Sequence, residues 1–248
     1  MLLYDLENYT GQLLATADFH DYCPNGLQVE GRSEVRSLVS GVSAGLDLLQ
    51  AALALGADAV LVHHGYFWKN EDPCVVGVKR RRLELLLRHD ISLLAYHLPL
   101  DAHPGLGNNA QLAAMLGLVD EGGFEEQNIG RHGVLERPQT LAEWTALVAG
   151  QLQRAPLVIG DESRLIRRVA WCSGGAQDYF TEAVKLGVDA FLTGEISEHN
   201  VHLARESGVA FISAGHYATE RYGVQALGDH LARHFGLQHQ FVDVPNPV

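Results

Sequence analysis

The sequence predicts an α/β protein made of two similar halves whose strands are mostly parallel. The word GADAVL, at residues 56–61, and the word GVDAFL, at residues 187–192, occupy the same slot in two strand–helix–strand patterns. Each pattern continues with a helix, another apolar strand and a histidine that a carboxylate follows four residues later. Units of this kind form parallel strands joined by right-handed crossovers. We therefore expect an internal duplication, with residues 1–125 as the first α/β half and residues 126–248 as the second.

Apolar spacing and turn residues predict the first elements in order. Residues 2–17 have helical periodicity, and Pro24-Asn25-Gly26 is turn chemistry ahead of a short extended segment. An ordinary surface loop is the simplest interpretation of that turn. Residues 38–41 then predict a strand, and Ser43 is the expected N-cap of the following helix. The apolar run 57–62, bounded by glycines, predicts a buried parallel strand.

The remaining elements follow from the same signals. A leucine-rich helix near residues 80–89 leads to a strand at 91–96. Residues 120–165 are expected to connect the halves, and Thr140 and Glu143 form a capping box that opens a helix there. The second half repeats the plan, with strands near residues 170, 190 and 210 and a last strand at 240–244.

Composition excludes several classes of protein. The chain has 248 residues, 47% hydrophobic and 19% charged, which suits a globular protein with one large core or two smaller ones. A net charge of −12 opposes broad binding to nucleic-acid phosphates, and the basic run at residues 79–82 is typical of a solvated helix face. We see no membrane-spanning run and no signal peptide. Three cysteines without CxxC spacing favour a reducing cytoplasm.

Two adjacent histidines, His63 and His64, stand where the buried strand 57–62 ends. The carboxyl end of a parallel strand is where open α/β sheets bind ligands. Successive strand residues point to opposite faces, so either the pair serves two metals or the backbone turns at this point. For the pair alone, one core histidine beside one strand-end histidine is the simpler interpretation.

Two histidine–carboxylate pairs follow other predicted parallel strands. The strand at 91–96 ends in HLPLD, and the strand near residue 210 leads to HYATE. Each group alone has an ordinary explanation, such as a strand-end hydrogen bond, a turn cap or a solvated helix residue. Their common position at one end of the predicted strands favours a shared site instead. The candidate residues are His63, His64, His97, Asp101, His216 and Glu220.

Local geometry is expected to differ between the two pairs. Glu220 should lie in or beside the first turn of a helix, where residues four apart share a face. Pro99 and Pro104 rule out a continuous helix after His97, so we expect a loop to place Asp101.

The second half has no histidine pair of its own. In the duplication, Gly194 and Glu195 take the place of His63 and His64. Glu195 is therefore either an acceptor beside the site or a solvated residue at a helix start. In both cases the two halves have diverged, and the site is expected to be asymmetric.

The donor types predict a transition-metal site. Imidazole and carboxylate ligands without thiolates suit Zn, Mn, Fe, Co or Ni, and the set is too rich in nitrogen for Ca or Mg. About five or six ligands exceed the roughly three of a mononuclear catalytic zinc site, which indicates two divalent ions. Two ions about 3.5 to 4 Å apart can share a carboxylate and activate water, as in many hydrolases.

Six longer motifs carry a resemblance to a known family. They are PNGLQVEG, VHHGYFWK, YHLPLDAHPGLGNNAQLA, IGRHG, FLTGEISEH and AGHYATER. Along nearly the whole chain they resemble the bacterial YbgI group of the NIF-three-like dinuclear-metal-centre family. The resemblance implies a three-layer αβα duplication with intertwined halves, a toroidal homohexamer, and His97 close to the metals. It assigns the metal ligands to His63, His64, Asp101, His216 and Glu220.

We therefore predict a cytoplasmic dinuclear metallohydrolase that acts on a small substrate. Members of the family are often labelled type 2 GTP cyclohydrolase homologues, which implies a purine nucleotide or another heterocyclic amide, although the sequence has no nucleotide-reading motif. Glu220 would bridge or orient the metals, and His97 would move a proton. A hypothesis from another class is a non-enzymatic metal-binding regulatory or interaction protein. A third hypothesis is a nucleic-acid-processing or DNA-repair role. The acidic net charge opposes this role unless nucleic-acid strands pass through the ring of the toroidal hexamer.

Overall fold

The computed structural model describes residues 1–248 as two compact units, each with its own sheet. The first unit holds residues 1–107 and 223–244, and the second holds residues 108–222 and 245–248. The predicted halves divide at residue 125 because that division follows the repeat in the sequence. The two units are defined instead by which residues contact one another in space. Residues 223–244 belong to the first unit because strand β11 (Gln238–Phe241) pairs with β2 (Ser37–Ser43) of its sheet.

The sheet of the first unit has the strand order β1-β4-β3-β2-β11. The further strands are β1 (Gly26–Val29), β3 (Ala59–His64) and β4 (Ser92–Ala95). All neighbours pair in parallel except β1 and β4, which are antiparallel. The helices of this unit are α1 (Leu3–Leu13), α2 (Leu46–Ala54), α3 (Gly77–Arg88), α4 (Leu98–Ala102) and the later part of α9 (His216–Phe235).

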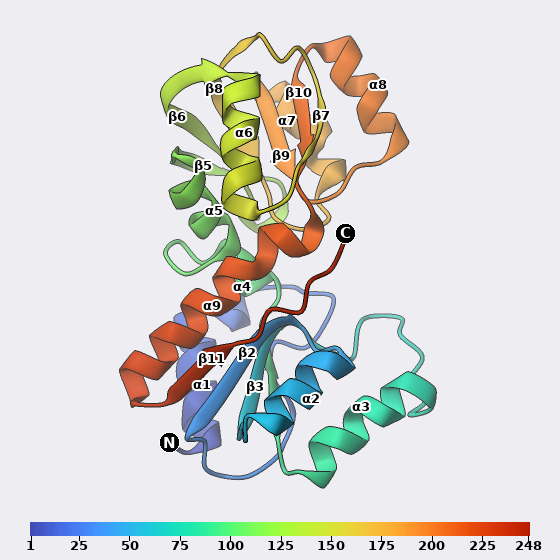
Figure 1. Cartoon of the computed structure of the whole chain (residues 1–248), viewed down its shortest axis with the longest axis vertical. Coiled ribbons are helices and arrows are strands. Elements are labelled where there is room, and N and C mark those ends of the chain that lie inside the picture. Colours follow the sequence, from blue (N-terminus) through green and yellow to red (C-terminus); the bar gives the residue numbers. More distant parts are fainter. The chain divides into compact units, whose positions relative to one another are not determined.

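Helices cover both faces of this first sheet. Because side chains alternate along a strand, Val60 and Val62 share one face, where they pack with Leu48 of α2 and Leu86 of α3. Figure 1 shows α1 and the last turns of α9 on the opposite face. The unit therefore has the three-layer αβα arrangement that was predicted, with the carboxyl ends of β3 and β4 at one edge.

The sheet of the second unit has the order β5-β6-β8-β9-β10-β7. Its strands are β5 (Leu118–Phe124), β6 (Gly130–Thr140), β7 (Leu157–Ile159), β8 (Leu165–Trp171), β9 (Ala190–Thr193) and β10 (Ala210–Ser213). Its helices are α5 (Asn108–Leu116), α6 (Leu141–Leu152), α7 (Phe180–Lys185), α8 (Glu198–Ser207) and the start of α9. Strands β8, β9 and β10 are parallel neighbours in the second sheet, and they pair in the same order as β2, β3 and β4 do in the first sheet. The predicted duplication is thus confirmed, and antiparallel pairings of β5, β6 and β7 extend the second sheet.

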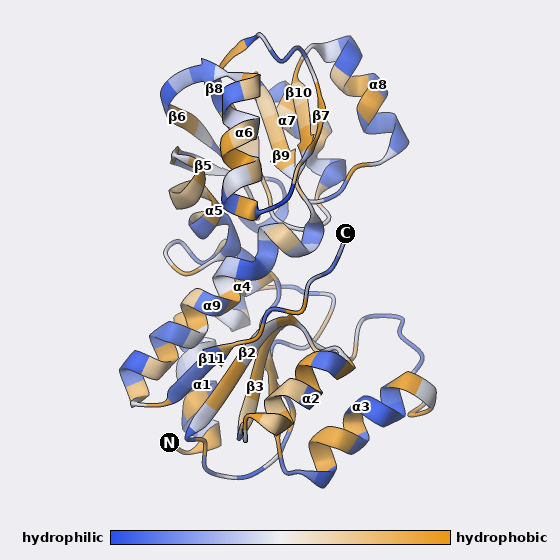
Figure 2. Ribbon diagram, viewed as in Figure 1, coloured by the Kyte–Doolittle hydropathy of each residue, from blue (hydrophilic) through white to orange (hydrophobic).

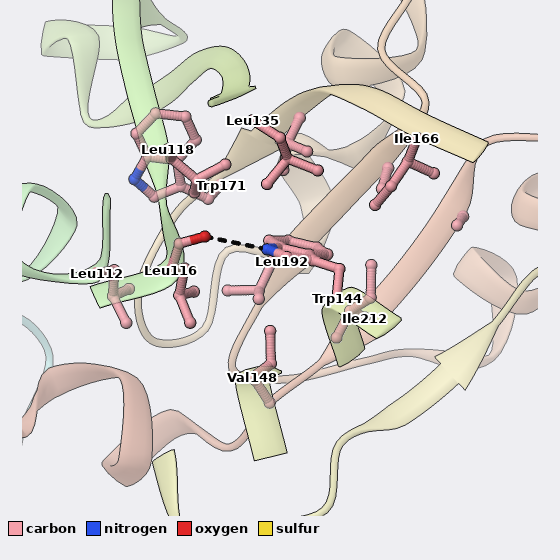
Figure 3. Packing of buried hydrophobic residues seen from close by; sticks show 14 of the residues in the cluster. Leu112, Leu116, Leu118, Leu135, Trp144, Val148, Ile166, Trp171, Leu192 and Ile212 are labelled. Carbon is pink, nitrogen blue, oxygen red and sulfur yellow. Dashed lines mark hydrogen bonds between the residues drawn. The ribbon is translucent and has the colours of Figure 1, made fainter. Parts of the chain in front are cut away.

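Apolar clusters cover the two faces of the second sheet. On one face Trp144 of α6 is fully buried, and its Nε1 donates to the Leu116 carbonyl at 3.3 Å (Figure 3). On the other face Phe180 of α7 packs on Phe191 and Phe211, with ring centroids 5.7 and 4.9 Å apart. Strands β9 and β10 are accordingly hydrophobic in Figure 2, as strands buried on both faces require. No helix of the protein has both the length and the apolar character needed to cross a bilayer.

The shared aspartate of the two duplicated words has a structural role. Asp58 accepts two backbone N–H groups at the start of β2, from Arg36 at 2.8 Å and Ser37 at 3.0 Å. Asp189 accepts two backbone N–H groups within β8, from Arg167 and Arg168, both at 2.9 Å. A nearby arginine also bonds each carboxylate. The aspartate that GADAVL and GVDAFL share thus bonds the backbone of the neighbouring strand in both halves.

The capping box is confirmed, but two other local predictions are wrong. Thr140 caps α6 together with Glu143. Ser43 is not an N-cap, because it is the last residue of β2 and α2 has Gly45 as its N-cap. Asp101 lies in the short helix α4 instead of a loop, since Pro99 sits in its first turn, where the missing N–H breaks no helical bond.

Candidate metal centre

Three histidine rings gather at the carboxyl ends of β3 and β4 in the first unit. The ring centroids of His63 and His64 lie 4.6 Å apart, and those of His63 and His97 lie 5.0 Å apart. Ligand nitrogens of the three rings all lie within 4.8 Å of one another. Asp101 adds a buried carboxylate, with Oδ2 3.5 Å from His63 Nε2. The first unit therefore brings all four of its predicted site residues together.

The histidine pair is held through its Nδ1 atoms. His63 Nδ1 donates to the Tyr96 carbonyl at 2.9 Å. His64 Nδ1 lies 3.1 Å from the hydroxyl of Ser43, the residue that the pairing of β2 and β3 places opposite it. Ser43 thus orients a site histidine, although its sequence context suggested a helix cap. With Nδ1 occupied, Nε2 is the ring atom that each histidine offers to a metal.

A buried aspartate from the N-terminal loop holds His97. His97 Nδ1 donates to Asp21 Oδ1 at 2.7 Å, and the Asp21 side chain is only 3% exposed. Burial alone would raise the pKa of Asp21, but the hydrogen bond and charge of His97, with hydrogen bonds from Asn25 and Tyr22, lower this pKa to about 2. Asp21 was not among the predicted site residues. It lies 76 positions from its partner, and no periodic signal connects residues so far apart.

In the second unit, His216 and Glu220 lie one turn apart on α9. His216 Nε2 is 3.2 Å from Glu220 Oε2, and His216 Nδ1 donates to Glu195 Oε1 at 2.6 Å. Burial, the largest single influence, lowers the pKa of His216, but Glu220 and then Glu195 outweigh it through hydrogen bonds and charge and raise this pKa to about 9. Glu220 is buried, whereas His216 is partly exposed. Of the two interpretations of Glu195, the structure shows the acceptor beside a site histidine.

Two glycines make room for this pair of residues. Gly174, with φ +67°, lies so close to Glu220 that a Cβ there would collide with Glu220 Oε1. A Cβ at Gly194 would lie 2.5 Å from His216 Cα. Gly194 occupies the slot that His63 fills in the first half. A second histidine pair therefore has no space in the second half, which is the physical reason for the predicted asymmetry.

The donor atoms of both clusters fit divalent transition metals. Imidazole Nε2 atoms beside buried carboxylates are the ligands that Zn, Mn, Fe, Co and Ni accept. Another grouping, Asp21, Cys23 and His97, suits a metal poorly. Burial and the charge of Asp21 raise the pKa of the Cys23 thiol to about 12, whereas a metal ligand must be a thiolate. The two clusters can thus hold metal ions through the six predicted residues, and their exact roles stay a prediction.

Comparisons with known proteins agree with this fold over the whole chain. The model of the family Duf34/NIF3 (NGG1p interacting factor 3) matches residues 1–247. A relative from Pseudomonas aeruginosa called GTP cyclohydrolase 1 type 2 homolog is 59% identical over 238 residues, which are 95% of this chain and 94% of the relative. A solved structure described as protein ybgI, of unknown function, has a TM-score of 0.96 at 49% identity, with 100% of both chains covered. A protein from Thermus thermophilus has a TM-score of 0.90 at 36% identity, again with 100% of both chains covered. The chain therefore belongs to the Duf34/NIF3 family.

Proposed function

We propose that this protein is a metal-dependent hydrolase with a dinuclear metal centre. The proposed ligands are His63, His64, Asp101, His216 and Glu220. The donor count supports this proposal, because the proposed ligands of the first unit are two imidazoles and one carboxylate and those of the second unit are one of each. These five donors exceed the roughly three protein ligands of a mononuclear catalytic zinc site.

The observation that carries the proposal of catalysis is the pair formed by His97 and Asp21. A protein that only binds metal needs ligands, whereas a hydrolase also needs a group that moves protons. His97 lies beside the proposed ligands and has its Nδ1 held by a buried carboxylate at 2.7 Å. An imidazole oriented by a carboxylate is the arrangement of many general acid–base catalysts.

The roles of the residues follow from this geometry. Two bound ions would supply Lewis acidity and water activation. Glu220 would bridge or orient the ions, and His97 Nε2 would accept a proton from the attacking water and return it to the leaving group. The substrate class rests on the names of the relatives, GTP cyclohydrolase 1 type 2 homolog, and we propose a purine nucleotide or similar heterocyclic amide. A cytoplasmic location and a homohexamer belong to the same proposal, and sedimentation analysis tests the latter.

Metal content and turnover test this function together. Elemental analysis of purified protein is expected to find about two transition-metal ions per chain, and fewer after His64→Ala combined with Glu220→Gln. Purine nucleotides are then screened with added Mn, Zn, Co or Fe. His97→Ala should lower kcat about 100- to 10,000-fold with metal content unchanged. His89→Ala, at an exposed position of the same unit, is the matched control. Protein without metal, or turnover that His97→Ala leaves intact, contradicts the proposal.

A metal-binding interaction protein is the second candidate. The family description names an interacting factor, and one segment of the first unit exposes several apolar side chains. Phe67 is 38% exposed, and Val75, Val76 and Val78 are each at least half exposed. Two bound ions without turnover under any metal would favour this candidate. A nucleic-acid role is opposed by the net charge of −12, and retention on DNA that falls with salt would support it.

A further inference from the structure

Residues 21–28, a loop that leads into the first residues of β1, bond to both segments that carry His63, His64 and His97. Gln28 Oε1 of β1 accepts from Tyr66 N at 2.6 Å, and the Tyr22 carbonyl of the loop accepts from Lys69 N at 2.6 Å, so both hold the segment that follows His64. Gln28 Nε2 also donates to the Pro24 carbonyl of the loop at 2.8 Å. The turn that looked like an ordinary surface loop in the sequence therefore forms one wall of the cluster.

The same loop holds His97 even more closely, through the carboxylate of Asp21. Oδ1 accepts from Tyr22 N at 2.6 Å and from His97 Nδ1 at 2.7 Å. Oδ2 accepts from Asn25 Nδ2 at 2.8 Å and from Leu98 N at 2.9 Å. Asn25 Oδ1 in turn accepts from His97 N at 2.7 Å, so both the ring and the backbone of this histidine are fixed.

The hydrogen bond to the Asp21 carboxylate determines which ring nitrogen of His97 carries the proton. An ionised carboxylate only accepts hydrogen bonds, so Nδ1 of His97 must be the protonated atom of the neutral ring. Nε2 is then left with its lone pair. A hydroxyl or amide in place of Asp21 could also donate, and it would not impose this choice.

The two halves use the same device at equivalent positions. His97 follows β4 and His216 follows β10, and each donates from Nδ1 to a carboxylate, at 2.7 Å and 2.6 Å. The carboxylates come from different places, because Asp21 lies in the N-terminal loop and Glu195 follows β9. His63 and His64 instead have uncharged partners at Nδ1. The carboxylate partner thus marks the histidine after the third parallel strand of each half.

We propose that Asp21 is a positioning residue that keeps His97 in the Nδ1–H tautomer and directs its Nε2 toward the neighbouring His63 and His64. The use of that Nε2 in catalysis rests on the function proposed above, whereas the tautomer does not. During turnover Nε2 takes one proton from the attacking water and gives one to the leaving group. The ring returns to its starting state, and Asp21 keeps its negative charge throughout.

Asp21→Asn tests the tautomer directly, in the full-length protein. Long-range proton–nitrogen NMR of metal-free protein labelled with nitrogen-15 histidine distinguishes the two neutral tautomers, and His97→Gln identifies the His97 signals. We expect Nδ1–H in the native protein and loss of that preference in Asp21→Asn. Asp18→Asn, at an exposed aspartate of the same region, should leave the spectrum unchanged. Circular dichroism shows that each variant is folded at the temperature used.

Metal content and kinetics supply the second readout. Asp21→Asn should keep the metal content of the native protein and lower kcat about 10- to 100-fold with little change in KM. Adding it to His97→Ala should cause no further loss, because the two residues act as one unit. A native Nε2–H tautomer, or a tautomer that Asp21→Asn does not alter, overturns the inference even if no substrate is ever turned over. Unchanged kcat in an active Asp21→Asn enzyme overturns it as well, while the hydrolase function would stand.

Discussion

Replacing Asp21 by asparagine should destabilise the folded protein by about 2 kcal/mol at pH 7. The carboxylate has an ordinary pKa of 3.8 and a folded-state pKa of about 2. At 1.36 kcal/mol for each tenfold change, this difference corresponds to about 2 kcal/mol of stability. The side chain is 3% exposed, so solvent screening weakens the effect little. Asparagine would also place an NH₂ group among N–H donors that need an acceptor.

The direction of the pH effect follows from the lowered pKa. The contribution of Asp21 is complete above about pH 4 and is lost as the pH falls through about 2, because the unfolded chain then binds the proton first. About half of the stability difference between the native protein and Asp21→Asn should therefore remain at pH 3. Other titrating groups contribute to both proteins alike and cancel in the difference.

Urea unfolding at pH 7 and pH 3, followed by circular dichroism and tryptophan fluorescence, measures this difference. Coincident transitions of the two probes are required, since the two units could unfold separately. Asp18→Asn is the control and should cost little at either pH. Equal stability of native protein and Asp21→Asn at pH 7 would refute the reasoning. So would a stability gap of the same size at pH 3.

Three further predictions concern the remaining groups. Gly174→Ala should displace Glu220 and reduce the bound metal found by elemental analysis, because the new Cβ would collide with Glu220 Oε1. In the control Gly150→Ala the new Cβ meets nothing within 4 Å, so this variant should keep its metal, and its free energy of unfolding should rise by up to about 1 kcal/mol. Of the three thiols, only the exposed Cys74 should react quickly with a disulfide reagent at pH 8. Cys23, whose pKa is raised to about 12 by burial and by the charge of Asp21, and the buried Cys172 should react only after unfolding. Two fast-reacting thiols in the folded protein would contradict this prediction. Burial lowers the pKa of His216, but Glu220 and Glu195 outweigh it and raise this pKa to about 9, so a metal that binds His216 must displace a proton. The affinity for zinc, measured by chelator competition, should therefore rise from pH 7 to pH 9. An affinity that stays constant over this range would contradict the prediction.

Repetition and periodicity are what made the fold predictable. The shared words around Asp58 and Asp189 predicted two parallel units, and the structure shows why both keep the aspartate. The positions of His63 and His216 at strand ends followed from the same strands. Thr140 and Glu143 act within one helical turn, so their capping box was also visible in the sequence.

The features that the sequence did not predict depend on contacts between distant segments. Ser43 has the composition of a helix cap, and only the pairing of β2 with β3 shows that it faces His64. Asp21 and Asn25 look like turn residues until strand β4 brings His97 beside them. The sequence predicts that Pro99 interrupts a helix, whereas Pro99 lies in the first turn of α4, which begins at Leu98. Local rules give each of these residues a plausible role, and tertiary structure replaces it with another.

The return of residues 223–244 to the first unit has a consequence for how the chain folds during synthesis. The second unit is nearly continuous and can close as soon as residue 222 has left the ribosome. Most residues of the first unit are translated earlier, yet strand β2 remains an unpaired edge of its sheet until β11 has been synthesised. An open strand edge is a site for pairing with other chains. We therefore expect the portion translated first to be the last to finish folding, and truncation before residue 238 to favour aggregation.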